Sequence, residues 1–259
     1  MKPNVRLAGK GIGAIMYREM RLFFGNSMTV VLSVASPVIY MALFSTSLNG
    51  LMPTMTYAGV SVPYIRFALP GLLIMSALSN VLVTSQSIFN EHLSNMLLDI
   101  LSTPVQHSAY MIGKILAGAS LAFIQSMLVF ASGVLIFRVP VGLTRFLGIC
   151  VLTIPICLAL SGLYMTALGL VKNIRAFILT TNILTNVIMF GSSIFYPTAS
   201  IPSALRPIAL INPATYCVDV IRDFLLGRVE PKSVAIVCVL AVLLTAAALV
   251  VFRRRFAEV

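Results

Sequence analysis

The chain has few charged residues, and acidic ones are the scarcest. Only 10% of its 259 residues are charged, whereas 59% are hydrophobic, and the mean hydropathy is +1.02. Soluble globular domains carry about 25% charged residues. The composition therefore excludes a water-soluble domain and indicates an integral membrane protein, in which lipid covers the remaining apolar surface.

Motifs for catalysis, metal binding and nucleic-acid binding are also missing. No G-x-x-x-x-G-K-[ST] sequence occurs, so the chain has no P-loop to hold ATP. His92 and His107 are the only histidines; they lack a cysteine or carboxylate cluster to complete a metal site, and the four cysteines have no metal-site spacing. The net charge of +11 suits anionic lipid rather than nucleic acid, since no basic cluster is interleaved with aromatic residues. We expect no catalytic, cofactor or metal site and no enzyme activity in this chain itself.

Long apolar runs separate the sparse charges. At about 1.5 Å per residue, such runs are long enough to cross a hydrocarbon core of about 30 Å. They are too continuous for the alternating strands of a barrel, so all of them are predicted to be helices. The predicted spans cover residues 28–48, 67–89, 112–137, 146–171, 177–195 and 234–252.

The placement of Lys and Arg predicts the orientation. Basic residues gather before the first span, in residues 1–27, and after the last, in the tail 253–259. Under the positive-inside rule both termini are expected in the cytoplasm, on either side of a transmembrane domain at 28–252.

The segment before the first span has an amphipathic pattern. Its apolar residues recur near helical spacing, while Arg18, Glu19 and Arg21 fall mainly on the other side. This pattern predicts a helix lying along the inner leaflet, and a plain basic anchor is the alternative. The apolar residues are Ile12, Ile15, Met16, Met20, Phe23 and Phe24.

Uncharged polar residues form stripes in the second and fifth predicted spans. A spacing of three or four places each set on roughly one face of its helix. Two interpretations stay open, namely hydrogen bonding between packed helices and the lining of a translocation path. No Asp or Glu lies within the predicted spans, which argues against ion-coupled transport. The stripe residues are Ser76, Asn80, Thr84, Ser87, Thr181, Asn182, Thr185, Asn186 and Ser193, and the candidate path consists of these without Ser87 and Ser193.

Prolines divide residues 196–227 into pieces too short to span, which predicts helices that enter the outer side of the bilayer and return. Asn212 before Pro213 predicts a helix start, because Asn caps free N–H groups and Pro at the first position has none to satisfy. On this helix Asp219 and Arg222 are three residues apart and are expected to form a structural ion pair.

Between the second and third spans, a half-polar segment at about 90–104 can neither cross a bilayer nor form a domain. It carries an apolar stripe at helical spacing, with Glu91 and Asp99 as charges that would fix its register on a cytosolic protein. A helix resting on the membrane is the alternative. The stripe consists of Leu93, Met96, Leu97, Ile100 and Leu101.

Three motifs in this order resemble the membrane subunits of ABC exporters of the type-2 permease group. They are LPGLLIMSALSN at 69–80, SIFNEHLSNMLLDILSTPVQ at 87–106, and FYPTASIPSALRPIALINPATYCVDVIRDFLLG at 195–227. Glu91 keeps the family's acidic residue and Pro104 its stop, whereas Asn90 and His92 stand where basic residues are frequent.

The resemblance implies a fold and a function. The fold is an all-α membrane domain of six helices, with an N-terminal interfacial helix, a cytoplasmic coupling helix and outer re-entrant helices. Two such chains are expected to pair with two ABC ATPase subunits, which would hold ATP and Mg. We expect a multi-pass permease of the inner cell membrane that exports an amphipathic, drug-like, lipid-like or lipid-linked glycan substrate by alternating access. The alternative is a stand-alone membrane channel or a membrane-embedded enzyme.

Overall fold

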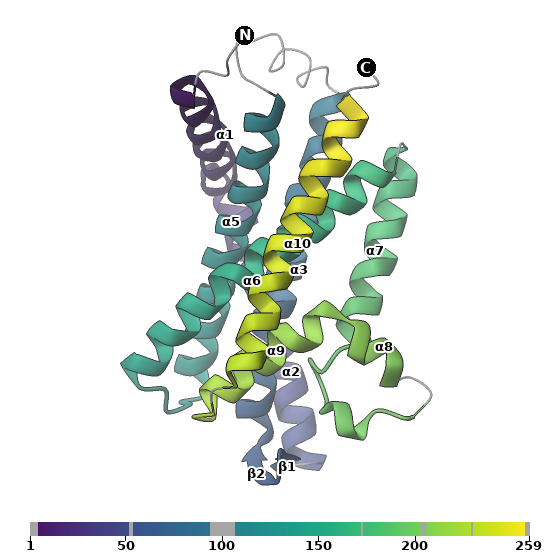
Figure 1. Cartoon of the computed structure of the whole chain (residues 1–259). Helices are drawn as coiled ribbons and strands as arrows, with labels where there is room; N and C mark the ends of the chain where they lie inside the picture. Colours follow the sequence, from purple (N-terminus) through teal and green to yellow (C-terminus); the bar gives the residue numbers. More distant parts are fainter. Residues whose placement is uncertain are drawn as a thin grey trace.

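Long helices account for most of the chain (Figure 1). The computed structural model describes residues 5–51, 54–93, 107–171, 173–203, 206–228 and 230–256. In chain order the elements are α1 (Val5–Gly25), α2 (Ser27–Leu51), β1 (Thr54–Tyr57), β2 (Val60–Pro63), α3 (Tyr64–Leu93), α5 (His107–Ile136), α6 (Leu143–Leu170), α7 (Ile174–Phe190), the 3-10 turn η1 (Thr198–Ser200), α8 (Arg206–Ile211), α9 (Pro213–Leu225) and α10 (Pro231–Phe256).

The lengths of the helices confirm an all-α membrane fold but not the number of spans. Within the described residues, α3, α5, α6 and α10 are each long and apolar enough to cross a membrane. The parts Lys10–Gly25 of α1 and Ser27–Ile39 of α2 pass the same test together, as a pair bent by 79°. By length and composition, the described part of the chain therefore supports 4 crossing helices, or 5 with the bent pair, rather than the six that the sequence predicted.

The fifth predicted span is shorter than expected. Helix α7 has 17 residues, or about 26 Å, less than the core thickness of about 30 Å. It ends at Phe190 because the chain turns at Gly191, whose N–H still bonds to the carbonyl of Val187. Residues 191–196 form bends instead of continuing the helix, although the prediction placed them largely within the span.

The two ends of the bundle differ in the helix termini that they gather (Figure 1). The beginning of α1, the end of α3, the beginning of α5 and the end of α10 lie together at one end, and the β1–β2 hairpin lies at the other. We call these the connector end and the hairpin end, because residues 94–106, which join α3 to α5 and lie outside the described residues, begin and end at the first.

A two-stranded antiparallel hairpin precedes α3, which the sequence analysis did not foresee. Thr54 pairs with Pro63 and Tyr57 with Val60. The turn residues Ala58 and Gly59 have φ angles of 49° and 80°. Positive φ at both central residues is the geometry of a type I′ turn, which matches the twist of hairpin strands.

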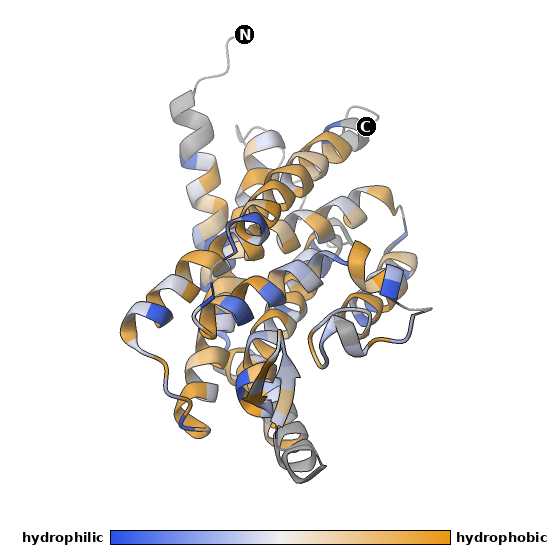
Figure 2. Ribbon diagram, turned by 60° about the horizontal axis from the view of Figure 1, so that its bottom comes forward, coloured by the Kyte–Doolittle hydropathy of each residue, from blue (hydrophilic) through white to orange (hydrophobic). Residues whose placement is uncertain are grey.

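Helix α3 lies at the centre of the bundle, and α10 lies at its surface. Of the most apolar window of each helix, 83% is buried for α3 but only 17% for α10. Gly162 of α6 permits close packing on α10, because a Cβ there would lie 2.7 Å from the backbone of Leu244 and Thr245. Figure 2 shows hydrophobic residues along most of the length of the helices, and many large apolar side chains are exposed, as expected for helices that face lipid.

Candidate functional site: a buried ring of ion pairs at the connector end

Four charged side chains meet at the connector end, where α1, α3 and α5 converge. The Arg18 Nη1 atom lies 2.9 Å from Glu19 Oε1 and 2.6 Å from Glu91 Oε1. The Lys114 Nζ atom lies 2.8 Å from Glu19 Oε1 and 2.6 Å from Glu91 Oε1. Each cation thus contacts both carboxylates, and the four side chains form a closed ring that joins three helices.

The ring is buried and its charges balance. The Lys114 side chain is fully buried, and its ammonium donates to both carboxylates and, at 3.4 Å, to the Ser87 hydroxyl. The Tyr110 hydroxyl, one helical turn before Lys114, donates to Glu91 Oε2 at 2.6 Å. Buried charges are tolerated only when they are paired and hydrogen-bonded, which this arrangement achieves.

The surroundings of Glu91 keep it ionised. Burial by itself raises the pKa of the Glu91 carboxyl, but the charge of Lys114 and hydrogen bonds from Lys114, Tyr110 and Arg18 hold that pKa below its ordinary value. For Arg18, burial opposes the charged form, yet the hydrogen bond to Glu91 and the charges of Glu91 and Glu19 keep the pKa of the guanidinium above its ordinary value. Both residues therefore stay charged at neutral pH.

Local sequence explains how α1 reaches the ring. Gly11, Ile15 and Glu19 are buried at a spacing of four residues, so they share the face of α1 that packs on the bundle. On α5, Gly113 permits this contact, because a Cβ there would lie 3.0 Å from the Ile15 side chain. The prediction that Glu19 lies on the polar side with Arg18 and Arg21 is thus wrong, since Glu19 follows Ile15 by one turn and points inward toward Lys114.

An apolar cluster lies next to the ring and contains residues from most of the long helices. Its low polarity strengthens charge interactions at its edge. The buried members are Ile15, Ile88, Tyr110, Met111, Ile115, Met165, Leu168, Phe177, Ala248 and Phe252.

The predicted coupling segment is described only at its beginning. Glu91 lies in the last turn of α3 and is 6% exposed, so in this structure it faces the ring instead of presenting its charge to a cytosolic protein. Its inward direction follows from the two cations that α1 and α5 place beside it. Leu93 is the last residue of α3. The other predicted coupling residues, Met96, Leu97, Asp99, Ile100 and Pro104, lie outside the described residues.

The polar stripe of α3 forms hydrogen bonds within the bundle. Ser76, Asn80 and Thr84 are all buried. The Ser76 hydroxyl donates to that of Ser126 at 3.3 Å, and the Asn80 amide donates to Gln125 Oε1 at 2.5 Å. These contacts favour the packing interpretation of the α3 stripe, because its polar groups are turned toward α5 and away from the surface.

The polar stripe of α7 divides between two faces. Thr181 is buried, and the Thr185 hydroxyl bonds to the Tyr164 hydroxyl at 2.5 Å, so both lie on the packed side. Asn182 and Asn186 are exposed on the other side. Of the seven residues proposed to line the path, only Asn182 and Asn186 are exposed on the surface of the chain.

Helix α9 starts where the sequence predicted. Pro213 is its first residue, and the Asn212 side chain accepts a hydrogen bond from the Ala214 N–H. The Asn212 amide also donates to the Ile188 carbonyl of α7 at 2.8 Å. With 13 residues, α9 spans about 20 Å and is too short to cross a bilayer as a single helix.

Arg222 of α9 is fully buried and ties together segments far apart in the sequence. Its Nη1 lies 2.8 Å from Asp219 Oδ1, in the predicted i, i+3 pair. Its Nε donates to the Phe67 carbonyl at the beginning of α3, and its Nη2 donates to the Ser193 carbonyl after α7. The guanidinium carbon also lies 3.7 Å from the centre of the Phe67 ring. These contacts give Arg222 a structural role.

The charged groups of both sites are paired with one another. Within the described residues, no group of three or more His, Cys, Asp and Glu side chains is placed to hold a metal ion. The fold and the ring together define a helical membrane protein in which buried ion pairs fix the relative positions of helices.

Comparison with known families identifies the class further. The family model described as ABC-2 type transporter matches residues 10–226, which include the ring and the Arg222 site. The chain belongs to this family and is a membrane permease component of an ABC-type transporter. Members of this family are the membrane component of such transporters and not the ATPase. A search of curated proteins returned no match to the chain.

Proposed function

We propose that the chain is the permease of an ATP-driven exporter and that the ring receives the motion of a separate ATPase. The observation that carries this proposal is the ring itself, which joins both ends of the connector 94–106 to α1. Glu91 lies three residues before the connector and Lys114 eight residues after it. Family membership implies an ABC ATPase partner, and the connector is the segment proposed to contact it.

The ring makes the connector end move as a unit. A force on the connector acts on the last turn of α3 and the first turns of α5, and both are bound to α1 through Arg18 and Glu19. Separating α3 or α5 from the other two helices would leave a buried charge without its partner, which costs about 3–5 kcal/mol. A rigid-body displacement of all three helices avoids that cost and is a common form of switching transition.

Exposed amides on α7 suit an interface with a second copy of the chain. Asn182 and Asn186 stand among large apolar side chains that are more than half exposed, including Leu179, Ile183 and Val187. A face with apolar and amide groups but no charge fits an amphipathic substrate better than an ion. We therefore place the path for a drug-like, lipid-like or lipid-linked substrate between the α7 helices of a homodimer, in a complex of two permeases and two ATPases in the inner membrane, with both termini in the cytoplasm.

The test is purification of the complex followed by disruption of the ring. The tagged chain, extracted from its native membrane, is expected to bring down a polypeptide with a P-loop, and the ATPase rate of this complex is then measured in liposomes. Glu91→Gln breaks the ring and is expected to keep assembly but to return ATP hydrolysis toward the rate of the isolated ATPase. Glu230→Gln, an exposed acidic residue just before α10, is the matched control.

Two results would count against the proposal. Transport by the purified chain in liposomes without any ATPase would indicate a stand-alone channel. ATP hydrolysis that is equally stimulated by the wild-type chain and by Glu91→Gln would mean that the ring does not transmit motion.

A further inference from the structure

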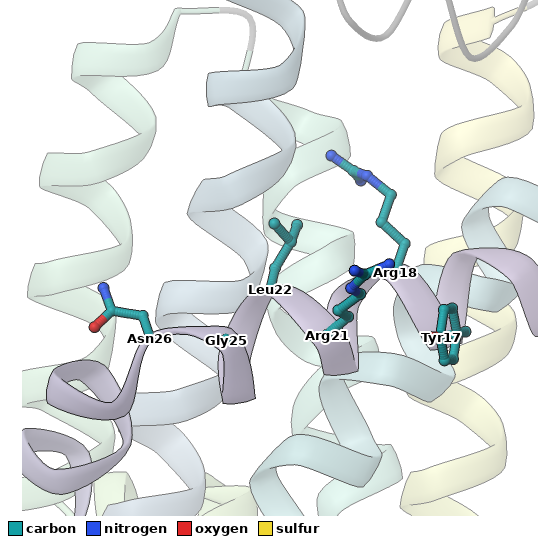
Figure 3. A pocket seen from close by; sticks show the side chains of 6 residues that line it. All are labelled: Tyr17, Arg18, Arg21, Leu22, Gly25 and Asn26. Carbon is teal, nitrogen blue, oxygen red and sulfur yellow. The ribbon is translucent and has the colours of Figure 1, made fainter.

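A groove of about 550 Å³ lies along the end of α1 and the beginning of α2. It is lined by Tyr17, Arg18, Arg21, Leu22, Gly25 and Asn26. Figure 3 shows Arg18, Leu22 and Asn26 directed to the same side of the joint between the two helices. The groove exists because the helices bend by 79° here, so that the last turn of α1 and the first turn of α2 border a common space.

The polar lining of the groove is positive. Two of its six residues are arginines and none is acidic. Arg18 is held by Glu19 and Glu91, so its charge is largely matched. Arg21 is exposed and forms no ion pair within the described residues, so it contributes the unmatched charge.

The beginning of α2 adds to this positive character. Asn26 caps the helix, because its Oδ1 accepts a hydrogen bond from the Thr29 N–H at 3.2 Å. The amide nitrogen of Asn26 is a further hydrogen-bond donor on the groove wall. The first turn of a helix also carries a partial positive charge and favours an anion. A guanidinium, an amide and a helix terminus thus all border the groove at the α1–α2 joint.

Apolar surface continues from the groove along α2. Leu22 on the groove wall is 58% exposed, and Met28, Val31 and Leu32 on the following turns of α2 are all more than half exposed. An inorganic or nucleotide phosphate would leave this surface uncovered. A ligand with an anionic head and long hydrocarbon chains would cover both parts, because the head contacts Arg21 while the chains lie against α2.

We propose that this groove is a binding site for an anionic phospholipid, with the phosphate at Arg21 and Arg18 and the acyl chains along α2. The proposal goes beyond the transport function and requires only that the α1–α2 joint lies at a membrane surface. Since Arg18 belongs to both the groove and the ring, the lipid also touches the junction that joins α1 to the connector.

Fluorescence quenching tests this site directly, because the chain contains no tryptophan. Leu22→Trp places a single indole on the groove wall, and the variant is reconstituted in phosphatidylcholine nanodiscs. Increasing fractions of brominated phosphatidylglycerol or brominated phosphatidylcholine are then added. Each basic residue at a membrane surface strengthens anionic-lipid binding roughly fivefold. We expect phosphatidylglycerol to reach half-maximal quenching at a roughly fivefold lower fraction than phosphatidylcholine.

Charge variants show whether the preference belongs to the groove. Arg21→Gln in the Leu22→Trp background is expected to abolish the difference between the two lipids. Arg175→Gln is the matched control, since Arg175 is an exposed arginine in the first turn of α7, outside the groove. This control is expected to leave the difference unchanged.

Three outcomes would overturn the proposal. Equal quenching by the two lipids would show ordinary contact with surrounding lipid, and a preference that survives Arg21→Gln would place the site elsewhere. Protection of the indole from both lipids would show that another copy of the chain covers the groove. If Leu22→Trp fails to fold, native mass spectrometry of the chain without this substitution tests the same site. Bound phosphatidylglycerol should then be lost in Arg21→Gln but kept in Arg175→Gln.

Discussion

Removing Lys114 is the most direct way to measure the strength of the ring. In Lys114→Met, the carboxylates of Glu19 and Glu91 share a single cation, Arg18. Both carboxylates are buried, because their side chains are only 6% and 7% exposed. Breaking a buried ion pair by removing one partner costs about 3–5 kcal/mol, because the remaining charge stays buried. We expect Lys114→Met to lower the free energy of unfolding by about this amount.

A second variant shows whether the lost energy comes from charge balance. Glu19→Gln alone leaves two cations with one carboxylate, and it is expected to cost less than Lys114→Met because the Arg18 side chain is 26% exposed. The double variant leaves Arg18 and Glu91 as a balanced pair at 2.6 Å. Its loss of stability should therefore be smaller than the sum of the two single losses, by roughly 0.5–3 kcal/mol.

Denaturation in mixed micelles provides the assay. The chain is titrated with SDS, and unfolding is followed by a thiol-reactive dye that reaches Cys157 and Cys217, which are both buried in the folded chain. Arg175→Gln combined with Glu230→Gln serves as a control of exposed charges and is expected to be additive within about 0.3–0.5 kcal/mol. If Lys114→Met and Glu19→Gln are additive to the same degree, the four charges do not act as a ring and the reasoning fails.

Three other predictions concern pH, packing and exposure. Because the pKa of Glu91 is lowered in the folded protein, its ionised carboxylate stabilises the fold at any pH above the ordinary carboxyl pKa of 4.5. This stability should be lost as the pH falls through the folded-state pKa, and the loss of stability on acidification should be smaller in Glu91→Gln. Gly162→Ala should cost about 1–3 kcal/mol in the same SDS titration, because the new methyl group meets the α10 backbone, whereas Gly13→Ala, which has open space, should cost nothing. In a cysteine-free background, Asn182→Cys should react with a soluble maleimide much faster than Asn80→Cys, and equal rates would contradict their different burial.

Hydropathy predicts the long helices well because it depends only on local composition. The apolar runs gave α3, α5, α6 and α10 as long crossing helices, and Asn212–Pro213 gave the start of α9 from local capping chemistry alone. The end of α7 was missed because Gly191 and the bends after it are set by contacts with α8 and α9, as in the bond between Asn212 and the Ile188 carbonyl. Such contacts are not visible in a hydropathy profile.

The ring was not predicted, because it depends on which helices meet. A helical pattern shows which residues of α1 share a face, but not that Glu19 would find an ammonium on the neighbouring helix. Lys114 did carry a signal in the sequence, since a lone charge at the end of an apolar span requires a partner. One partner of Lys114 among the described residues is Glu91. The sequence had predicted that Glu91 docks on a cytosolic protein.

Helix α3 is held at both ends, which suggests how motion crosses the bundle. Glu91 is bound in the ring at the connector end, and the Phe67 carbonyl is bound by Arg222 about 36 Å away along the helix. Because β2 continues directly into α3, we expect an ATP-driven displacement at the connector to reach the hairpin as a tilt of α3 about the anchor that Arg222 provides. A dye on Ser61→Cys in the exposed part of β2 should change its fluorescence when ATP is added to the assembled complex, and Arg222→Met should remove that change while ATP hydrolysis continues. A fluorescence change that persists in Arg222→Met would show that the motion of the hairpin end does not depend on Arg222. The reason is that this substitution removes the bond from α9 to the Phe67 carbonyl in the first turn of α3.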